Sequence, residues 1–261
     1  MQDLSPWALA ALCSGIMVAI TWLGIVFVRP FLRLLLRRQP GVNDLVSYSS
    51  AGFSLLYGLL LGLLSVATYQ NMEKVNTFIG QEAASLGLLY LASSSFPEPL
   101  RGDLQALQRD YTLYVINKDW PAHEHGQILL GGASRLTVIR EKLLSFEPVS
   151  ANQEILLGQT LTIFNDLVQA RVGRLGGVGL GLPGVFWYVL LIGAAINVIL
   201  IWMLEMRFFA HLVLGGLVSF FLGVMIFLIM ALDYPLRGSV SIEPAAYQLI
   251  YDRVMASDET I

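Results

Sequence analysis

The chain has 261 residues, of which 56% are hydrophobic and only 13% are charged, and its mean hydropathy is +0.66. Soluble domains carry about 25% charged residues, so the composition excludes an ordinary soluble protein and indicates a membrane protein. The net charge of −3 argues against a nucleic-acid partner, which needs a basic surface. The single cysteine, Cys13, excludes a disulfide framework and a cysteine metal cluster.

Four apolar segments are long enough to cross a bilayer, because about 20 apolar residues span its hydrocarbon core. They are residues 6–28, 50–69, 184–204 and 212–232. The first is longer than the apolar core of a signal peptide, and only Asp3 is charged before it. We therefore expect a retained first helix rather than a cleaved leader.

The arginines predict how the chain is oriented in the membrane. The link between the first two spans contains Arg29, Arg33, Arg37 and Arg38. The link between the last two spans carries Arg207, and the N-terminal tail has no basic residue. By the positive-inside rule both links are cytoplasmic and both termini lie outside. The expected location is a bacterial inner membrane, with residues 1–69 forming the first two spans and their cytoplasmic link.

Residues 70–183 are expected to form an extramembrane helical bundle. No proline follows Tyr69 until Pro97, so the second span should continue as one long helix. Further helices are predicted at 100–120, 127–146 and 151–175, each ended by a proline or a glycine-rich stretch. No segment has the alternating pattern of a strand. The predicted fold class is an all-α membrane protein: four transmembrane helices, with an antiparallel helical bundle inserted between the second and third spans.

Residues 184–232 contain the third and fourth spans, and 233–261 form a tail with a short helix. Three polar residues are expected to be structural. Asn197 lies at mid-depth in the third span, where an amide can bond a neighbouring helix, and Asp233 lies at the membrane boundary. Glu82 falls on an apolar helix face and needs a partner if buried; Arg109 and Arg171 are the candidates.

The span at 50–69 is two-faced when its residues are placed at about 100° intervals. One face is mostly leucine, and the other is small and polar. The residues of this second face that are predicted to line a pore are Ser54, Tyr57, Gly58, Leu61, Gly62, Ser65 and Thr68. Two interpretations stay open. Gly58-x-x-x-Gly62 would by itself explain close helix packing, whereas hydroxyls on one line suit a wetted path narrowed by an apolar ring.

Other candidate sites are weaker. Arg171 and Arg174 near the end of a helix either complement its negative terminus or attract anions toward the membrane. The cluster His123-Glu124-His125 is interpreted as a solvated turn, because zinc needs three or four ligands; no metal and no cofactor are expected. The glycine-rich stretch 176–184 lacks the strand and the Lys-Ser/Thr of a nucleotide-binding loop. No catalytic motif is present, so an enzyme is the least favoured class.

Several blocks resemble a bestrophin-like family of membrane proteins, long catalogued as a domain of unknown function. They are NDLVSYSSAGFSLLYGLLLGLLSVATYQ at 43–70, EAASLGLLY at 82–90, RDYTLYVINKDWP at 109–121, FNDLVQARVGRL at 164–175, GLPGVFW at 181–187 and ALDYPLRGSVSIEP at 231–244. Leu91 and Leu236 depart from the family pattern, where an arginine and an aromatic residue are usual.

The resemblance implies four spans with an extramembrane helical domain. By relation to bestrophins proper, it implies a pentameric anion channel whose pore is lined by the second span. Bestrophins place the helical domain in the cytosol, whereas the arginines here place it outside. The predicted function is a homo-oligomeric channel in the lipid bilayer for small anions such as chloride. The alternative is a membrane-anchored sensor or scaffold without a pore; a secondary transporter, lacking inverted repeats and intramembrane charges, ranks third.

Overall fold

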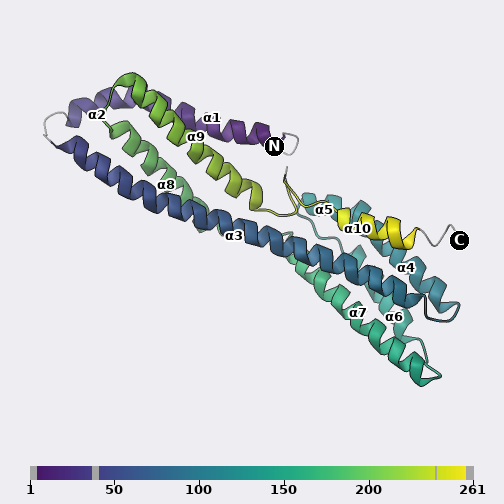
Figure 1. Ribbon diagram of the computed structural model, residues 1–261. Helices are drawn as coiled ribbons and strands as arrows, with labels where there is room; N and C mark the ends of the chain where they lie inside the picture. Colours follow the sequence, from purple (N-terminus) through teal and green to yellow (C-terminus); the bar gives the residue numbers. More distant parts are fainter. Residues whose placement is uncertain (1–4, 37–40, 239, 257–261) are drawn as a thin grey trace. The chain divides into compact units, whose positions relative to one another are not determined.

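A computed structural model describes residues 5–36, 41–238 and 240–256, and every regular element in these ranges is a helix (Figure 1). The chain divides into two compact units. The first contains residues 1–70 and 181–233, and the second contains 71–180 and 234–261. Arg37 and Arg38 of the arginine-rich link lie outside the described residues.

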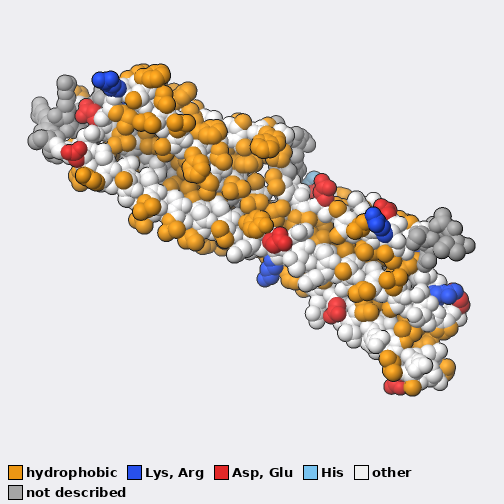
Figure 2. Space-filling model, in the orientation of Figure 1, with side chains coloured by type: hydrophobic (Ala, Val, Ile, Leu, Met, Phe, Trp, Pro, Cys, Tyr) orange, Lys and Arg blue, Asp and Glu red, His pale blue; other side chains and the backbone are white. Residues whose placement is uncertain are grey.

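The first unit contains the membrane spans. Helix α1 (Pro6–Leu23) continues through a π-helical turn (Gly24–Val28) into α2 (Arg29–Leu36). Helix α3 (Val42–Ser93) begins in this unit, and α8 (Gly184–Met203) and α9 (Phe208–Leu232) complete it. Among the described residues, four helices are long and apolar enough to cross a membrane, and they contain the four predicted spans. Figure 2 shows hydrophobic side chains covering much of the surface of these helices. The predicted fold class is confirmed.

Local sequence explains where several helices begin. The Ser5 hydroxyl accepts a hydrogen bond from the Ala8 amide at the start of α1, and Pro6 occupies the first turn, where a missing N–H costs nothing. Helix α3 begins after Gly41, whose φ of +88° favours glycine. It then runs without a break to Ser93, as the absence of proline predicted.

Helices α1 and α9 approach closely through small residues. A Cβ added to Gly223 would lie 2.5 Å from the Cα of Ser14, so only glycine fits there. One turn of α9 away, the hydroxyls of Thr21 and Ser219 are 2.5 Å apart and fully buried. Without a hydrophobic drive between helices in lipid, such packing and hydrogen bonds hold spans together.

The second unit is a helical bundle with an apolar core. It combines the C-terminal half of α3 with α4 (Leu100–Tyr114), a π-helical turn (Val115–Asp119), α5 (Trp120–Glu124), α6 (Gly131–Leu144), α7 (Ala151–Gly176) and α10 (Ala245–Ile250), which ends in a π-helical turn (Tyr251–Met255). Leu86, Leu104, Ile139 and Leu167 are fully buried in its core. The Ser150 hydroxyl caps α7 by accepting from the Gln153 amide.

One predicted helix end is wrong. Pro121 was expected to stop the helix that begins at Leu100, but helical structure continues to Glu124. Pro121 lies in the first turn of α5, where proline's missing N–H has no intrahelical partner to lose. The π-helical turn before it changes the hydrogen-bond register. As a result His123, expected in a solvated turn, is buried at the end of α5 with 0% exposure.

Candidate functional site

The small and polar face of α3 divides into two parts within the first unit. Tyr57, Leu61 and Thr68 are buried, with no more than 5% of each residue exposed. Gly58 is exposed, and Gly62 is half-buried. The residues predicted to line a pore therefore do not share one environment: some are packed inside the chain, and some lie open.

Tyr57 fixes the buried part of this face against α8. Its hydroxyl donates to the carbonyl oxygen of Leu190 at 2.7 Å, and its ring stacks on Phe53 with centroids 5.9 Å apart. Gly193 of α8 makes this possible, because a Cβ there would lie 2.3 Å from the tyrosine ring. Leu61 joins the same apolar cluster. These contacts hold α3 against α8 at Tyr57.

Gly58 and Gly62 of α3 do not serve close packing among the described residues. Apart from the helix's own nearby backbone, no atom of the described residues lies within 4 Å of a Cβ added at Gly58 or Gly62. This contrasts with Gly193, where the neighbouring ring would be overlapped. The interpretation that Gly58-x-x-x-Gly62 packs against another span of the same chain therefore finds no contact to support it.

The hydroxyls on this face are bonded within the chain. Ser65 donates to the carbonyl of Leu61 at 2.8 Å, and Thr68 donates to that of Leu64 at 3.0 Å. Ser54 accepts from Nδ2 of Asn197 at 3.3 Å. A hydroxyl whose proton is given to a backbone carbonyl offers lone pairs to its surroundings, not a donor. Ser65 would have to rotate to donate a hydrogen bond to an anion.

Asn197 and Asp233, which were expected to be structural, each form hydrogen bonds to groups of other segments of the first unit. Asn197 is 6% exposed and links α8 to α3 through Ser54. Asp233, just after α9, accepts from the backbone amide of Leu182 and from the indole N–H of Trp187. Its carboxylate thus fixes the start of α8 to the end of α9.

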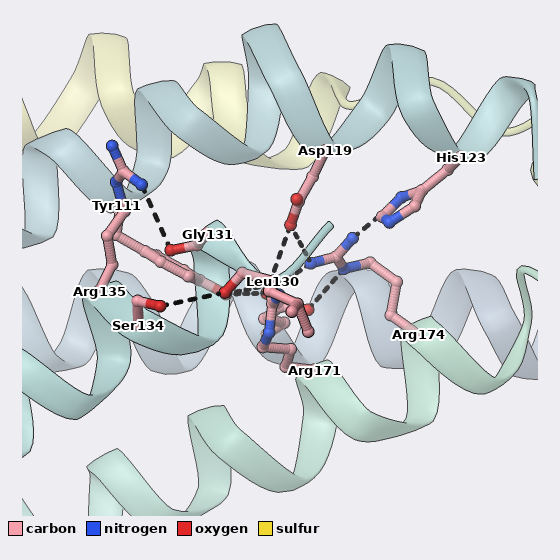
Figure 3. A network of polar contacts seen from close by, with 10 residues as sticks. Tyr111, Asp119, His123, Leu130, Gly131, Ser134, Arg135, Arg171 and Arg174 are labelled. Carbon is pink, nitrogen blue, oxygen red and sulfur yellow. Dashed lines mark hydrogen bonds and ion pairs between the residues drawn. The ribbon is translucent and has the colours of Figure 1, made fainter. Parts of the chain in front are cut away.

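Arg171 and Arg174 lie in a buried network of the second unit (Figure 3). Arg174 is fully buried and forms a two-pronged ion pair with Glu82, with Nε–Oε2 at 2.7 Å and Nη2–Oε1 at 3.1 Å. Arg171 pairs with Asp119 at 3.0 Å and is 4% exposed. The partner of Glu82 is thus neither Arg109 nor Arg171. Because two arginines face two carboxylates, the network carries no net charge to offer an anion.

A tyrosine joins the two ion pairs. The Tyr111 hydroxyl accepts from Nη1 of Arg171 at 3.1 Å and donates to Oε1 of Glu82 at 2.5 Å. Burial, and then the negative charge of Glu82, raise the pKa of Tyr111 well above its ordinary value, so it stays a donor. The connected groups come from α3, α4, the turn after α4 and α7, so the network ties the bundle together.

His123 is the neutral end of the network. Its Nδ1 lies 3.2 Å from Nη1 of Arg174. Since arginine has only donors, Nδ1 must accept and the ring proton lies on Nε2. Burial, together with the positive charges of Arg174 and Arg171, lowers the pKa of His123 to about 3. The imidazole is therefore uncharged at neutral pH.

Sequence reasoning missed Asp119, His123 and Tyr111 as members of this network. A signal was present: these three residues are spaced eight and four apart, which places them near one face of a continuous helix. The expected stop at Pro121 concealed it. Tyr247 was also missed; its ring is fully buried with its centroid 5.8 Å from the Arg174 guanidinium.

The chain is similar in sequence to a known family and in fold to solved structures. The model of the bestrophin-like domain matches residues 15–247. No curated protein matches the chain. A crystal structure of a bacterial bestrophin homologue from Klebsiella pneumoniae superposes with a TM-score of 0.70 at 12% identity, covering 95% of this chain and 96% of that one. A crystal structure described only as a membrane protein gives a TM-score of 0.71 at 12% identity, with 97% and 98% covered.

At these identities the solved structures show a shared fold, and the family match spans most of the sequence. The resemblance inferred from the sequence blocks is confirmed. The chain is an integral membrane protein and belongs to the bestrophin-like family.

Proposed function

We propose that the chain is the subunit of an oligomeric channel for small anions, with the pore formed around the open face of α3. The observation that carries the proposal is the pair of unused glycines. Gly58 and Gly62 lie beside Tyr57, which bonds the span to α8, yet apart from their chain neighbours and the local helix backbone no described atom lies within 4 Å of a Cβ added at either glycine. In spans, small residues on one face let other backbones or water approach closely.

The lining residues of this proposed pore are Gly58, Gly62 and Ser65, with Ser54 at the edge of the same face. Tyr57, Leu61 and Thr68 take a different role in the proposal. Because they are buried within the chain, they position α3 and set how far its open face extends toward the pore. This reduces the predicted set of seven to the residues that a path outside the subunit would reach.

A ring of subunits is part of the proposal. One helix with one small face cannot surround a water path, whereas several copies arranged about an axis can. The resemblance to bestrophins supports five copies and supports anions as the conducted species. Both termini outside, in a bacterial inner membrane, belong to the same proposal. Arg171 and Arg174 have no anion-attracting role in it, because their charges are balanced by Asp119 and Glu82.

Single-channel recording of the purified protein in planar bilayers under a chloride gradient tests this function. We expect discrete openings whose reversal potential follows the chloride gradient. Ser65→Leu, on the open face, should lower conductance far more than Leu63→Ala, whose side chain is 61% exposed on the opposite face. No conductance at any pH or calcium concentration, or equal effects of the two substitutions, would contradict the proposal.

The mass of the detergent-solubilised protein gives a second test. A stable oligomer is required, because the proposed path lies between copies. A monomer that retains helical content would contradict the pore and favour the sensor or scaffold alternative.

A further inference from the structure

An open cavity of about 450 Å³ lies at one end of the membrane spans in the first unit. Its lining comes from the π-helical turn after α1, from α2, from the link between α8 and α9, and from the start of α9. Figure 1 shows α2 and these ends of α8 and α9 at the same end of the unit. The lining includes the charged residues Arg29 and Glu205 and the apolar residues Ile25, Val26, Leu34 and Phe208.

The cavity lies at the depth of the lipid headgroups. Glu205 belongs to the short link between the spans α8 and α9, so it is at a membrane boundary. Two tryptophans mark the same end of the spans. The indole N–H of Trp22 donates to the Leu212 carbonyl at 3.0 Å, and that of Trp202 donates to the Thr21 carbonyl at 3.1 Å. Tryptophan is enriched at the boundary between hydrocarbon and water, so a phospholipid beside these spans would have its headgroup at the level of the cavity.

Hydrogen bonds to the backbone fix the two charged residues of the cavity. Arg29 is buried, and its Nη2 donates to the carbonyl oxygen of Met206. Glu205 is exposed, and its backbone amide donates to Oδ1 of Asn43 at 2.8 Å. A guanidinium has several donors and a carboxylate has several acceptor positions, so each can bind a ligand in addition to its other partners. The described lining thus offers one cation and one anion at fixed positions.

The apolar lining continues onto the surface that faces lipid. Val26, Leu34 and Phe208 are all exposed, and in a chain that crosses a bilayer such side chains contact acyl chains. A ligand that matches the whole cavity therefore carries both a negative and a positive group, with an apolar chain attached. A zwitterionic phospholipid has this composition.

We propose that this cavity binds a phospholipid whose headgroup carries a primary ammonium group, as that of phosphatidylethanolamine does. The phosphate binds Arg29, the ammonium group donates to Glu205, and an acyl chain packs on the exposed apolar lining. A headgroup with a negative charge only would place that charge near the carboxylate of Glu205 without a cation to offset it. A quaternary ammonium group has no N–H to donate. The proposal does not depend on channel activity or on the orientation of the chain, since it concerns one end of the spans.

Native mass spectrometry of the full-length protein in detergent micelles tests the site. Phosphatidylethanolamine, phosphatidylglycerol and phosphatidylcholine with identical acyl chains are titrated, and bound lipid per subunit is counted. We expect phosphatidylethanolamine to bind about fivefold more tightly than the other two, as one charged contact at a partly exposed site would give. Glu205→Gln, at an exposed position, should remove this preference. Glu73→Gln is the matched control, because Glu73 is an exposed glutamate of α3 in the second unit.

Filling the cavity gives an independent test. Val26→Trp, at an exposed lining position, should abolish the preferred binding of phosphatidylethanolamine. Val28→Trp, in the same π-helical turn but outside the described lining, should not. Melting temperatures of all variants identify any that fail to fold.

Two further probes test the phosphate and the acyl chain without a substitution at the buried Arg29. Hexadecylamine has the ammonium group and a chain but no phosphate, so it should bind about tenfold more weakly than phosphatidylethanolamine. Free phosphoethanolamine has both charges but no chain, and it should compete only at concentrations far above those of the lipid.

Four outcomes would overturn the proposal. They are equal binding of the three phospholipids, an unchanged preference in folded Glu205→Gln, an unchanged preference in folded Val26→Trp, and binding of hexadecylamine as tight as that of phosphatidylethanolamine. Competition by free phosphoethanolamine at the concentration of the lipid would also overturn it, because the site would then take a soluble zwitterion rather than a membrane lipid.

Discussion

The two units of this protein hold their helices together by different means. In the second unit, buried ion pairs such as Glu82–Arg174 connect helices distant in sequence. In the first, contact comes from small residues such as Gly223 on α9 and from hydroxyl pairs such as Thr21–Ser219. A charge pair buried in lipid would bear a larger desolvation cost. Close packing of helix backbones therefore holds the spans together at a lower cost. Gly58 and Gly62 of α3 differ from Gly223, because no described neighbouring helix packs closely against them.

The largest effect expected from this comparison is at the ion pair of the second unit. Glu82→Gln leaves buried Arg174 only the carboxylate of Asp119, 3.7 Å away and already paired with Arg171, as counter-charge, so the second unit should lose about 3–5 kcal/mol of unfolding free energy. Thermal unfolding by circular dichroism measures this. Glu141→Gln, an exposed glutamate of α6, should change little.

Replacing both members of the Glu82–Arg174 pair tests whether their contributions to stability depend on one another. Glu82→Met with Arg174→Met removes both charges, and a buried pair replaced by apolar groups is often near neutral. The double variant should be more stable than either single variant. If the effects simply add, the two charges do not depend on one another.

The next effect concerns close packing in the first unit. Gly223→Ala places a methyl group 2.5 Å from the Cα of Ser14. Since that neighbour is backbone, α1 and α9 must separate, at a cost of about 1–3 kcal/mol. Unfolding in mixed micelles would report the loss. Unchanged stability would mean that α1 and α9 do not pack as described.

A smaller effect is the pH dependence of stability that His123 gives to the second unit. The pKa of His123 is lowered to about 3 in the folded chain, against about 6.5 when unfolded. Between these values the unfolded state binds the extra proton. His123 therefore makes stability fall as pH drops below about 6.5, by up to about 1.4 kcal/mol per unit. His123→Gln should flatten this slope between pH 6 and 4.

The exposed His125 provides the control for that measurement. His125→Gln should leave the pH dependence of the melting temperature as in the parent protein. Equal slopes in the parent protein and His123→Gln would show that His123 is not held neutral by the network.

The smallest effect on stability is expected at the open face of α3. Gly58→Ala meets no described atom of another helix within 4 Å, so the unfolding free energy of the subunit should change by no more than about 1 kcal/mol, the helix-propensity difference. Conductance, in contrast, should fall, because the added methyl projects toward the proposed pore. A large loss of subunit stability without loss of oligomer would contradict the open face.

The sequence alone determined the four spans and the approximate positions of the bundle helices. Apolar length fixed four membrane helices, and the absence of proline after Tyr69 predicted the uninterrupted α3. The helix predicted at 151–175 agrees with α7, which begins at Ala151. These features depend on neighbours a few residues apart, so their signals are local. The six blocks between residues 43 and 244 together suggested the family.

Only the tertiary structure decided which faces meet. Glu82 and Arg174 are 92 positions apart, and the sequence offered other arginines as partners. The contact of Tyr57 with Leu190 buries one part of the small and polar face of α3. Gly58 and Gly62 stay open on the same helix. The continuation of the helix through Pro121 brought His123 inside. Long-range packing chooses among locally equivalent alternatives, because burial and charge pairing depend on residues that periodicity cannot place next to one another.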